Sequence, residues 1–259
     1  MNSRNIYEKN LKYWTERVPG YSEVNKLELA TAQRRNWKRC LQDEIEKTFS
    51  HHVTEDLRVL DIGTGPGFFA IILCELGYDV TAVDLTSAML EEARNNAGLL
   101  AGNIVFSVMD AEALTYGDNS FDVVVSRNLT WNLPHPEKAY AEWVRVLKSG
   151  GLLLNFDANW YTYLYEETAK AAYIQDRINS AEQGVWDQNI GENFDVMEDI
   201  ARCMPLSEIR RPAWDMKQLS NLGVKCSVDE KIWQRVWSAE EKLNYASTPM
   251  FLIKAQKIM

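Results

Sequence analysis

The stretch Asp61-Ile62-Gly63-Thr64-Gly65-Pro66-Gly67 decides the fold of this 259-residue chain. It ends a short run rich in β-branched residues, Arg58 to Ile62, and leads into an apolar segment of helical character, Phe68 to Leu76. A glycine-rich turn between a strand and a helix lets the backbone approach a ligand closely and points the amides of the helix N-terminus at it. By itself, the turn indicates only a nucleotide-like ligand.

The spacing of the glycines argues against a dinucleotide. In the dinucleotide-binding pattern GxGxxG the last glycine would stand at Phe68, whereas here the third glycine, Gly67, comes one residue earlier. A carboxylate, Asp61, also lies two residues before the first glycine. An NAD(P)-dependent oxidoreductase on the same type of sheet is therefore the less favoured alternative.

Two further acids follow the next two predicted strands. Asp84 follows the strand 79–83 at about the twenty-residue spacing of an acid that accepts hydrogen bonds from both ribose hydroxyls, with a helix N-cap as its alternative role. Asp110 follows the strand 104–109, where the exocyclic amine of an adenine would lie. Acids at three successive strand ends suit a cationic, phosphate-free adenosine ligand better than a pyrophosphate.

The rest of the chain continues the alternation of strands and helices. Strand-like runs at 58–62, 79–83, 104–109, 121–126 and 152–156 are interspersed with helical segments at 68–76, 87–100 and 136–147. This order predicts an α/β fold with a parallel sheet and right-handed crossovers, and we expect Gly150-Gly151 to end the helix before the fifth strand. A helix at 212–222 and strands at 224–228 and 249–255 complete the pattern.

Two helical segments accompany this core. Residues 1–49 have apolar residues at helical spacing and form the predicted N-terminal helical segment, which we expect to break at Pro19-Gly20. Residues 159–204 are rich in aromatic and polar residues, give no strand signal, and form a predicted helical cap insertion. Residues 50–158 and 205–259 then form the ligand-binding core.

Composition and charge limit the kind of partner. Hydrophobic residues at 46% and charged residues at 25% are typical of a globular protein. The chain has 28 basic and 37 acidic residues, and this net charge of −9 argues against a nucleic-acid partner. The four cysteines form no CxxC pair, so no metal site is expected. No apolar segment is long enough to span a bilayer, so we expect a cytoplasmic protein without a membrane partner.

Two more motifs lie around the fourth and fifth strands, at Phe121 to Asn128 and at Arg145 to Gly151. Together with Asp61 to Gly67, Asp84 and Asp110-Ala111-Glu112, they resemble the motifs of class I S-adenosylmethionine-dependent methyltransferases, although proline is commoner than Ser149 in the last turn. The resemblance covers about 57–158 and, more weakly, the C-terminal strand pair. It implies a Rossmann-like, doubly wound, mostly parallel seven-stranded sheet whose final strand is antiparallel.

The resemblance also implies a cofactor and the residues that bind it. The cofactor would be S-adenosyl-L-methionine, with S-adenosyl-L-homocysteine as the product. The expected contacts are Asp61, Gly63, Thr64, Gly65 and Gly67 for the methionine part, Asp84 for the ribose, Leu85 and Met89 for the adenine faces, Asp110 and Ala111 for the adenine edge, and Arg127 beyond the fourth strand. For Leu85 and Met89, a place in the apolar core is the alternative.

Methyl transfer from a sulfonium releases a neutral thioether, so no acid has to assist its departure. The expected enzyme therefore works mainly by holding the nucleophile in line with the methyl group. The candidate catalytic residues are His135, Arg127 and Tyr21, and a capping or surface role is the alternative for His135. A non-catalytic module that binds S-adenosylmethionine is a further alternative function.

The expected acceptor contacts follow the fourth and fifth strands. They are Asn128, Trp131, Asp157, Trp160 and Tyr161, with packing in the core or under the cap as the alternative for Trp131 and Trp160. The chain lacks the Asn/Asp-Pro-Pro-aromatic motif of nucleic-acid amine methyltransferases, and it lacks the Pro-Cys nucleophile of pyrimidine-carbon methyltransferases. The expected acceptor is therefore a small molecule or a short peptide that is methylated on oxygen, nitrogen or sulfur.

Overall fold

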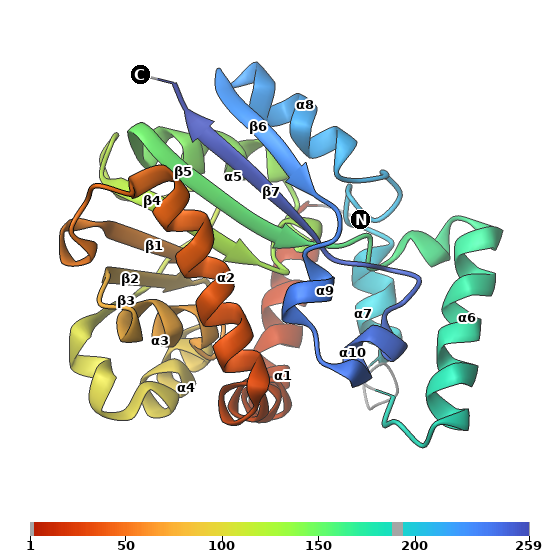
Figure 1. Cartoon of the computed structure of the whole chain (residues 1–259). Coiled ribbons are helices and arrows are strands. Elements are labelled where there is room, and N and C mark those ends of the chain that lie inside the picture. The colour runs from red at the N-terminus through yellow and green to blue at the C-terminus, as the bar shows by residue number, and fades with distance from the viewer. Residues whose placement is uncertain (1–2, 188–193, 259) are drawn as a thin grey trace.

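The computed structural model describes residues 3–187 and 194–258, and a seven-stranded sheet of order β3-β2-β1-β4-β5-β7-β6 lies at its centre (Figure 1). The strands are β1 (Arg58–Ile62), β2 (Asp79–Asp84), β3 (Ile104–Val108), β4 (Phe121–Arg127), β5 (Leu147–Asp157), β6 (Val224–Asp229) and β7 (Phe251–Lys257). β7 pairs antiparallel with both of its neighbours, and the other strand pairs are parallel. The predicted mostly parallel sheet with an antiparallel final strand is confirmed.

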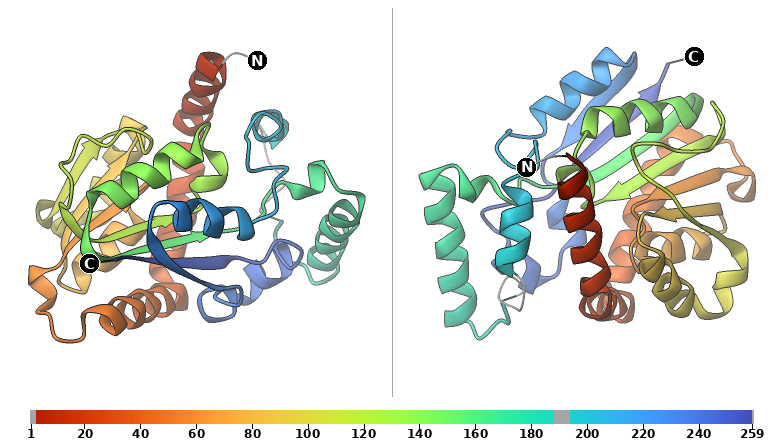
Figure 2. Two further views of the ribbon diagram at one scale, coloured as in Figure 1. Left: turned by 90° about the horizontal axis from the view of Figure 1, so that it is seen from above. Right: turned by 180° about the vertical axis from the view of Figure 1, so that it is seen from behind.

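Helices cover both faces of the sheet (Figure 2). α2 (Ala32–Phe49), α3 (Phe68–Glu75) and α9 (Trp233–Val236) pack on one face, and α5 (Pro136–Val146) and α8 (Ala213–Asn221) pack on the other. α4 (Ser87–Ala97) lies against β2 and β3. The longer helices that remain are α1 (Ser3–Ala30), α6 (Glu167–Glu182), α7 (Phe194–Ala201) and α10 (Ala239–Asn244), and they gather beyond the carboxyl ends of the parallel strands (Figure 1).

The central strands are apolar because helices cover both of their faces. In β4, Val123, Val124 and Val125 are all fully buried, and they alternate between the two apolar clusters on either side of the sheet. Trp37 of α2 is a large buried side chain of one cluster, and Trp143 of α5 is its counterpart in the other. This packing holds the strand ends in register, so the residues that follow β1, β2 and β4 meet at one edge.

α1 is one continuous helix, so the predicted break at Pro19-Gly20 is wrong. Pro19 lies inside the helix, where it has no N–H to donate to the carbonyl four residues earlier. Side chains on both sides of the proline are buried, among them Tyr13 before it and Ser22 after it. This packing outweighs the local cost of the proline, and the chain turns only at Thr31, between α1 and α2.

The prediction that Gly150-Gly151 ends a helix is wrong as well. α5 ends at Val146, and β5 already includes both glycines. The register between β4 and β5 shifts along this part of the strand, so the glycines lie in an irregular, bulged stretch. A Cβ atom on Gly151 would lie 2.8 Å from the carbonyl oxygen of Lys148, and this crowding explains the glycine there.

The segment 159–204 contains α6 and α7, and its residues 188–193 lie outside the described part of the chain. α7 packs against α1, where Met197 and Ile200 form an apolar cluster with Tyr13. α6 lies at the outer edge of the molecule, where it contacts α10 (Figure 1). Over residues 3–187 and 194–258, no helix combines the length and the apolar character that a membrane crossing requires.

Candidate functional site

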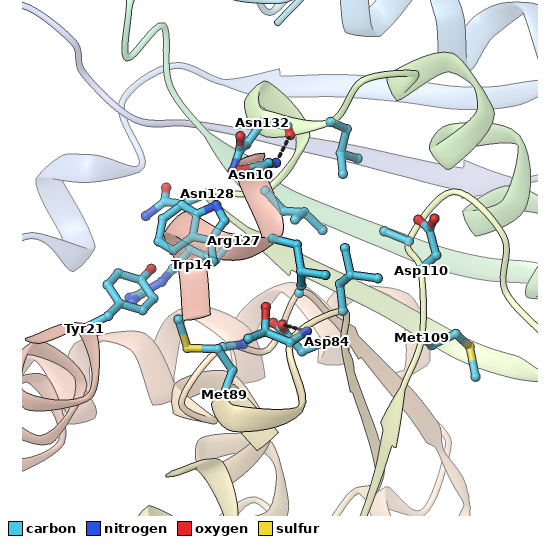
Figure 3. A pocket seen from close by; sticks show the side chains of 18 residues that line it. Asn10, Trp14, Tyr21, Asp84, Met89, Met109, Asp110, Arg127, Asn128 and Asn132 are labelled. Carbon is cyan, nitrogen blue, oxygen red and sulfur yellow. Dashed lines mark hydrogen bonds between the residues drawn. The ribbon is translucent and has the colours of Figure 1, made fainter. Parts of the chain in front are cut away.

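A cleft lies at the carboxyl edge of the sheet, where β1, β2, β3 and β4 end (Figure 3). This strand-edge cleft encloses about 770 Å³ of space that is continuous with solvent. α1 contributes one wall, and the ends of β2 and β4, the loops after the four strands and the first turn of α4 contribute the rest. The lining residues are Asn10, Leu11, Trp14, Tyr21, Gly63, Gly65, Asp84, Leu85, Thr86, Met89, Met109, Asp110, Ala111, Arg127, Asn128, Leu129, Asn132 and Leu133.

The glycine turn brings bare backbone to this cleft. Gly63 and Gly65 line it, with φ angles of +69° and +53°. A Cβ atom on Gly63 would lie 2.7 Å from a methyl carbon of Leu129, so a larger residue does not fit. Gly67 does not line the cleft, because it precedes α3 with φ of +92° and packs against Ala93 of α4. Gly63 therefore makes room for Leu129, Gly65 makes room for the Tyr21 ring, and Gly67 allows close packing of helices.

Asp84 lies at the end of β2 and faces the cleft beside the glycine turn. One carboxylate oxygen accepts a 2.9 Å hydrogen bond from the Gly65 N–H, and the other accepts a 2.9 Å hydrogen bond from the Thr86 N–H. Burial raises the pKa of Asp84. Thr86 occupies the N-cap position of α4, so the alternative role of Asp84 as the N-cap does not apply.

Three more predicted cofactor contacts line the cleft, namely Leu85, Met89 and Ala111. Met89 is almost fully buried, so it belongs to the apolar core and to the cleft wall at once. Asp110 lines the end of the cleft that lies away from Asn128 (Figure 3). Its carboxylate accepts a 2.8 Å hydrogen bond from the Glu112 N–H, which holds the loop after β3 in a tight turn.

Asp61 lies behind the glycine turn rather than in the strand-edge cleft. It is 2% exposed and accepts a 2.6 Å hydrogen bond from the Thr64 hydroxyl. Both residues line a small inner cavity, which shares Gly63, Tyr21 and Arg127 with the cleft. Burial raises the pKa of Asp61 to about 7. A cationic group that reached the inner cavity would therefore meet a carboxyl group that titrates near neutral pH.

Arg127 joins the end of β4 to α1. Its guanidinium donates hydrogen bonds of 2.9 and 2.8 Å to the two carboxylate oxygens of Glu28, and it lies 4.5 Å from the centre of the Phe68 ring. The Arg127 and Glu28 side chains are only 12% and 8% exposed. Burial raises the pKa of the neighbouring Tyr21, and the positive charge of Arg127 opposes this effect. The ion pair holds α1, which carries Tyr21, against the cleft.

A second cavity opens beside the cleft, and most of its walls are aromatic. This aromatic pocket is open to solvent, and its lining residues are Tyr13, Trp14, Arg17, Tyr21, Asn128, Trp131, Trp160, Tyr161, Tyr163, Met197 and Tyr245. Trp14, Tyr21 and Asn128 line both the pocket and the cleft. The lining includes one side chain with a full charge, Arg17, and no acid. Such walls suit a flat ring that is neutral or anionic.

Asp157 lies one layer behind the aromatic pocket and does not line it. Its fully buried carboxylate accepts hydrogen bonds from the Trp131 backbone N–H at 3.0 Å and from the Trp160 indole N–H at 3.1 Å. It also forms an ion pair with Arg211 at 2.6 Å. Asp157 therefore holds two walls of the pocket, and its surroundings leave it no direct contact with an acceptor there.

His135 lies outside the strand-edge cleft and the aromatic pocket. Its Nδ1 atom is 2.9 Å from a carboxylate oxygen of Glu112, and its backbone N–H donates a 2.7 Å hydrogen bond to the other oxygen. It occupies the N-cap position of α5 without a capping hydrogen bond from its side chain. This position favours the surface role over that of a catalytic base.

The structure thus brings most of the predicted site residues together, and it adds others that sequence reasoning missed. Asn10 and Leu11 of α1, Asn132 and Leu133 after β4, and Tyr245 after α10 carry no recognisable motif. They reach the site only because tertiary packing joins distant segments. The aromatic composition of 159–204 was the one available signal for the pocket, and it extends to Tyr163.

Three asparagines of the cleft have buried side-chain oxygens without a hydrogen-bond donor among the described residues. They are Asn10, Asn128 and Asn132. Buried acceptors normally have a donor, so a ligand with amine or hydroxyl groups would satisfy them. This agrees with the acid-lined, phosphate-free adenosine site that the sequence predicts. In the described ranges, no group of His, Cys, Asp and Glu side chains is arranged to hold a metal ion.

Comparison with known proteins gives a consistent assignment of the core. Residues 60–155 match the protein family described as "Methyltransferase domain". The chain is 34% identical over 157 residues to the demethylmenaquinone methyltransferase of Renibacterium salmoninarum, covering 61% of this chain and 62% of that protein. It is 31% identical over 109 residues to a ubiquinone biosynthesis O-methyltransferase of Coxiella burnetii, covering 41% of this chain and 47% of that protein. The chain thus spans 62% and 47% of the lengths of these two relatives.

Solved structures share the fold at low sequence identity. The structure of a SAM-dependent methyltransferase from Aquifex aeolicus matches with a TM-score of 0.53 and 17% identity, covering 85% of this chain and 89% of that one. At this identity the match concerns the fold alone.

Proposed function

We propose that this chain transfers a methyl group from S-adenosyl-L-methionine to a small aromatic acceptor. Its residues 60–155 match a methyltransferase domain, and its fold is that of the class I S-adenosylmethionine-dependent methyltransferases. One observation carries the proposal: the strand-edge cleft and the aromatic pocket share Trp14, Tyr21 and Asn128 as a common wall. A methyl donor in the cleft and an acceptor in the pocket would meet at this wall.

The cofactor would lie along the strand-edge cleft. Asp84 would accept hydrogen bonds from the ribose hydroxyls, since its two oxygens are already oriented by backbone amides at the floor of the cleft. Leu85 and Met89 would contact the adenine faces, and Asp110 with Ala111 would face the adenine edge. The unsatisfied oxygens of Asn10 and Asn132 support an amine-bearing ligand there.

The methionine end of the cofactor would point toward the inner cavity. Asp61 and Thr64 line that cavity together with Arg127, whose two terminal guanidinium nitrogens are already paired with Glu28. The Asp61 carboxyl group would therefore accept a hydrogen bond from the ammonium of the methionine part. Gly63 lines both the inner cavity and the strand-edge cleft, so a ligand in the cleft would pass this glycine to reach Asp61.

S-adenosylmethionine supplies an electrophilic methyl group whose leaving thioether is neutral. The chain's own contribution is then to bind, orient and exclude water. Trp14 and Tyr21 bring aromatic faces to the common wall, where they would stabilise positive charge and keep water away. Holding two reactants in line can contribute several kcal/mol to lowering the barrier. An acceptor that reacts at an O–H or N–H also loses that proton, which would pass to solvent, since His135 lies outside both cavities.

The aromatic pocket supports a planar ring as the acceptor. Its lining offers ring faces from α1, from the loops after β4 and β5, and from Tyr245. Arg17, with no acid beside it in the lining, favours a neutral or anionic acceptor over a cationic one. The two curated relatives are named for demethylmenaquinone and for ubiquinone biosynthesis, and quinone headgroups are planar rings of this kind.

Calorimetric titration with S-adenosylmethionine and S-adenosylhomocysteine tests the cofactor. We expect micromolar binding of both by the wild type and a loss of at least tenfold in Asp84→Asn, because the ribose loses a charged hydrogen-bond acceptor. Asp79→Asn is the matched control, since Asp79 lies at the other end of the same strand and is exposed. Binding of NAD with no binding of S-adenosylmethionine would overturn the proposal.

Turnover separates an enzyme from a binding module. We expect S-adenosylhomocysteine to form when the protein is incubated with S-adenosylmethionine and a panel of phenols, hydroquinones and naphthols. Trp131→Leu should reduce turnover of these acceptors without changing the affinity for S-adenosylhomocysteine, because Trp131 lines only the aromatic pocket. Cofactor binding without turnover of any small aromatic, and with turnover of a peptide, would contradict the assignment of the acceptor.

A further inference from the structure

Asn128 lies at the junction of the two cavities. It directly follows β4 and lines both the strand-edge cleft and the aromatic pocket, a property that it shares with only Trp14 and Tyr21 among the described lining residues. Of these three, Asn128 has the only carboxamide. Figure 3 shows it beside Trp14 and at the opposite end of the cleft from Asp110.

The backbone of Asn128 is held firmly in an unusual conformation. Its φ angle is +57°, in the left-handed region that non-glycine residues other than asparagine and aspartate rarely adopt. Its N–H donates a 2.8 Å hydrogen bond to the Phe156 carbonyl, and its own carbonyl accepts a 3.0 Å hydrogen bond from the Trp131 indole. The backbone groups are thus satisfied on both sides, and the side chain is held at the junction.

The side-chain oxygen, in contrast, has no donor among the described residues. The Oδ1 atom of Asn128 is buried and accepts no hydrogen bond from residues 3–187 or 194–258. A buried carboxamide oxygen without a donor is costly, and such groups in native proteins are usually explained by a ligand or water. A molecule in one of the two cavities that Asn128 lines would supply the donor that this oxygen lacks.

We infer that Asn128 orients the acceptor by accepting a hydrogen bond from its reacting hydroxyl or amine group. This inference rests on the proposed function, because the acceptor is placed in the aromatic pocket. A hydrogen bond from the reacting O–H or N–H to the carboxamide fixes the direction of that atom and leaves its lone pair free to face the cleft. Asn128 would then select acceptors that carry an O–H or N–H at the reacting atom over rings of equal size that lack one.

The test compares two probes of similar shape, 2-naphthol and 2-methylnaphthalene, on protein saturated with S-adenosylhomocysteine. Quenching of tryptophan fluorescence reports binding, because three tryptophans line the aromatic pocket. We expect the preference for the naphthol over the methyl compound to fall about tenfold in Asn128→Gly, the usual effect of one hydrogen bond to a buried group. Glycine tolerates the positive φ, so this variant removes the side chain without adding backbone strain.

Two further variants separate recognition from structure. Asn128→Asp keeps an oxygen that accepts the hydroxyl hydrogen bond, so we expect it to retain the preference for the naphthol. Asn119→Gly is the matched control, since Asn119 has φ of +55° but is exposed and far from both cavities. It should change neither the preference nor the affinity for S-adenosylhomocysteine.

The outcomes distinguish this inference from the function on which it rests. If the wild type does not bind S-adenosylhomocysteine, the proposed function fails and the inference fails with it. If S-adenosylhomocysteine binds and Asn128→Gly shows the same preference between the two probes as the wild type, the inference alone is overturned. A loss of S-adenosylhomocysteine affinity of more than tenfold in Asn128→Gly would assign the residue to the cofactor and would also overturn the inference.

Discussion

The Oδ2 atom of Asp157 lies 2.6 Å from the Nη1 atom of Arg211, and both side chains are completely buried. Arg211 also forms an ion pair with Asp215 at 2.7 Å, so one guanidinium is held between two carboxylates. Asp215 in turn accepts a 2.5 Å hydrogen bond from the hydroxyl of Tyr140. This cluster connects the end of β5 to the segment before α8, and it lies behind the walls of the aromatic pocket.

The charge on Asp157 should matter for stability. Asp157→Asn keeps the shape of the side chain but leaves Arg211 with one of its two buried carboxylate partners. We expect the free energy of unfolding to fall by about 3 kcal/mol, as measured by urea denaturation. Asp118→Asn is the control, because it breaks a 2.8 Å pair with Arg145 in which the acid is 69% exposed. Its cost should stay below about 1 kcal/mol, and equal costs would contradict a special role for burial.

Gly63 should tolerate no side chain. Gly63→Ala combines a positive φ with a Cβ atom only 2.7 Å from Leu129, so it should destabilise the fold by about 2 to 3 kcal/mol and weaken the binding of S-adenosylmethionine. Gly184→Ala has a similar φ of +65° but meets no atom within 4 Å. Its cost should be about 1 kcal/mol, from backbone strain alone. Thermal denaturation and calorimetry check both effects, and equal losses would rule out the clash as the cause.

Asp61 should make the protein less stable as the pH rises. Its pKa in the folded protein is about 7, above the ordinary value of 3.8, so the folded state holds this proton more tightly than the unfolded chain does. The stabilising contribution of neutral Asp61 is complete below pH of about 4 and is lost as the pH rises to about 7. Asp61→Asn stays neutral and has no such loss.

The measurement is the difference in unfolding free energy between Asp61→Asn and the wild type. From pH 5 to pH 8 this difference should change by about 2 to 3 kcal/mol in favour of the variant. Glu241, whose pKa burial also raises to about 7, is present in both proteins, so its contribution cancels. A difference that does not vary with pH would show that Asp61 is already ionised at pH 5.

The Arg127–Glu28 pair should support α1 and the cleft together. Glu28→Gln removes the charge that faces a buried guanidinium, so we expect a loss of about 3 kcal/mol in stability and weaker cofactor binding. Glu23→Gln, on the same helix, breaks a pair with Lys26 in which the acid is 74% exposed. That change should cost less than about 0.5 kcal/mol. Equal cofactor affinity in Glu28→Gln and Glu23→Gln would show that the Arg127–Glu28 ion pair does not contribute to cofactor binding.

The parts of the site that the sequence predicts are those that are local in the chain. Gly63, Gly65 and Asp84 stand at strand ends, and the strands themselves are readable from β-branched runs, so their meeting at one edge follows from the topology of a parallel sheet. Asp61 is equally readable as a residue, but its place in a separate inner cavity depends on how Tyr21 and Arg127 pack over it.

Other features depend on tertiary packing that no local pattern records. Proline predicts a helix break, yet packing on both sides of Pro19 keeps α1 intact. Tyr245 and Asn10 come from opposite ends of the chain, and neither has a motif around it. Asp157 shows the same limit, because its residue type and position suit an acceptor contact, and only Arg211, distant in sequence, reveals its structural role.

The continuity of α1 has a thermodynamic consequence for the two ligands. One continuous helix supplies Asn10 and Leu11 to the strand-edge cleft, Tyr13 and Arg17 to the aromatic pocket, and Trp14 and Tyr21 to both. A ligand that orders this helix from one side lowers the entropic cost of binding on the other side. Linkage then requires the effect to be mutual: the factor by which cofactor tightens acceptor binding equals the factor by which acceptor tightens cofactor binding.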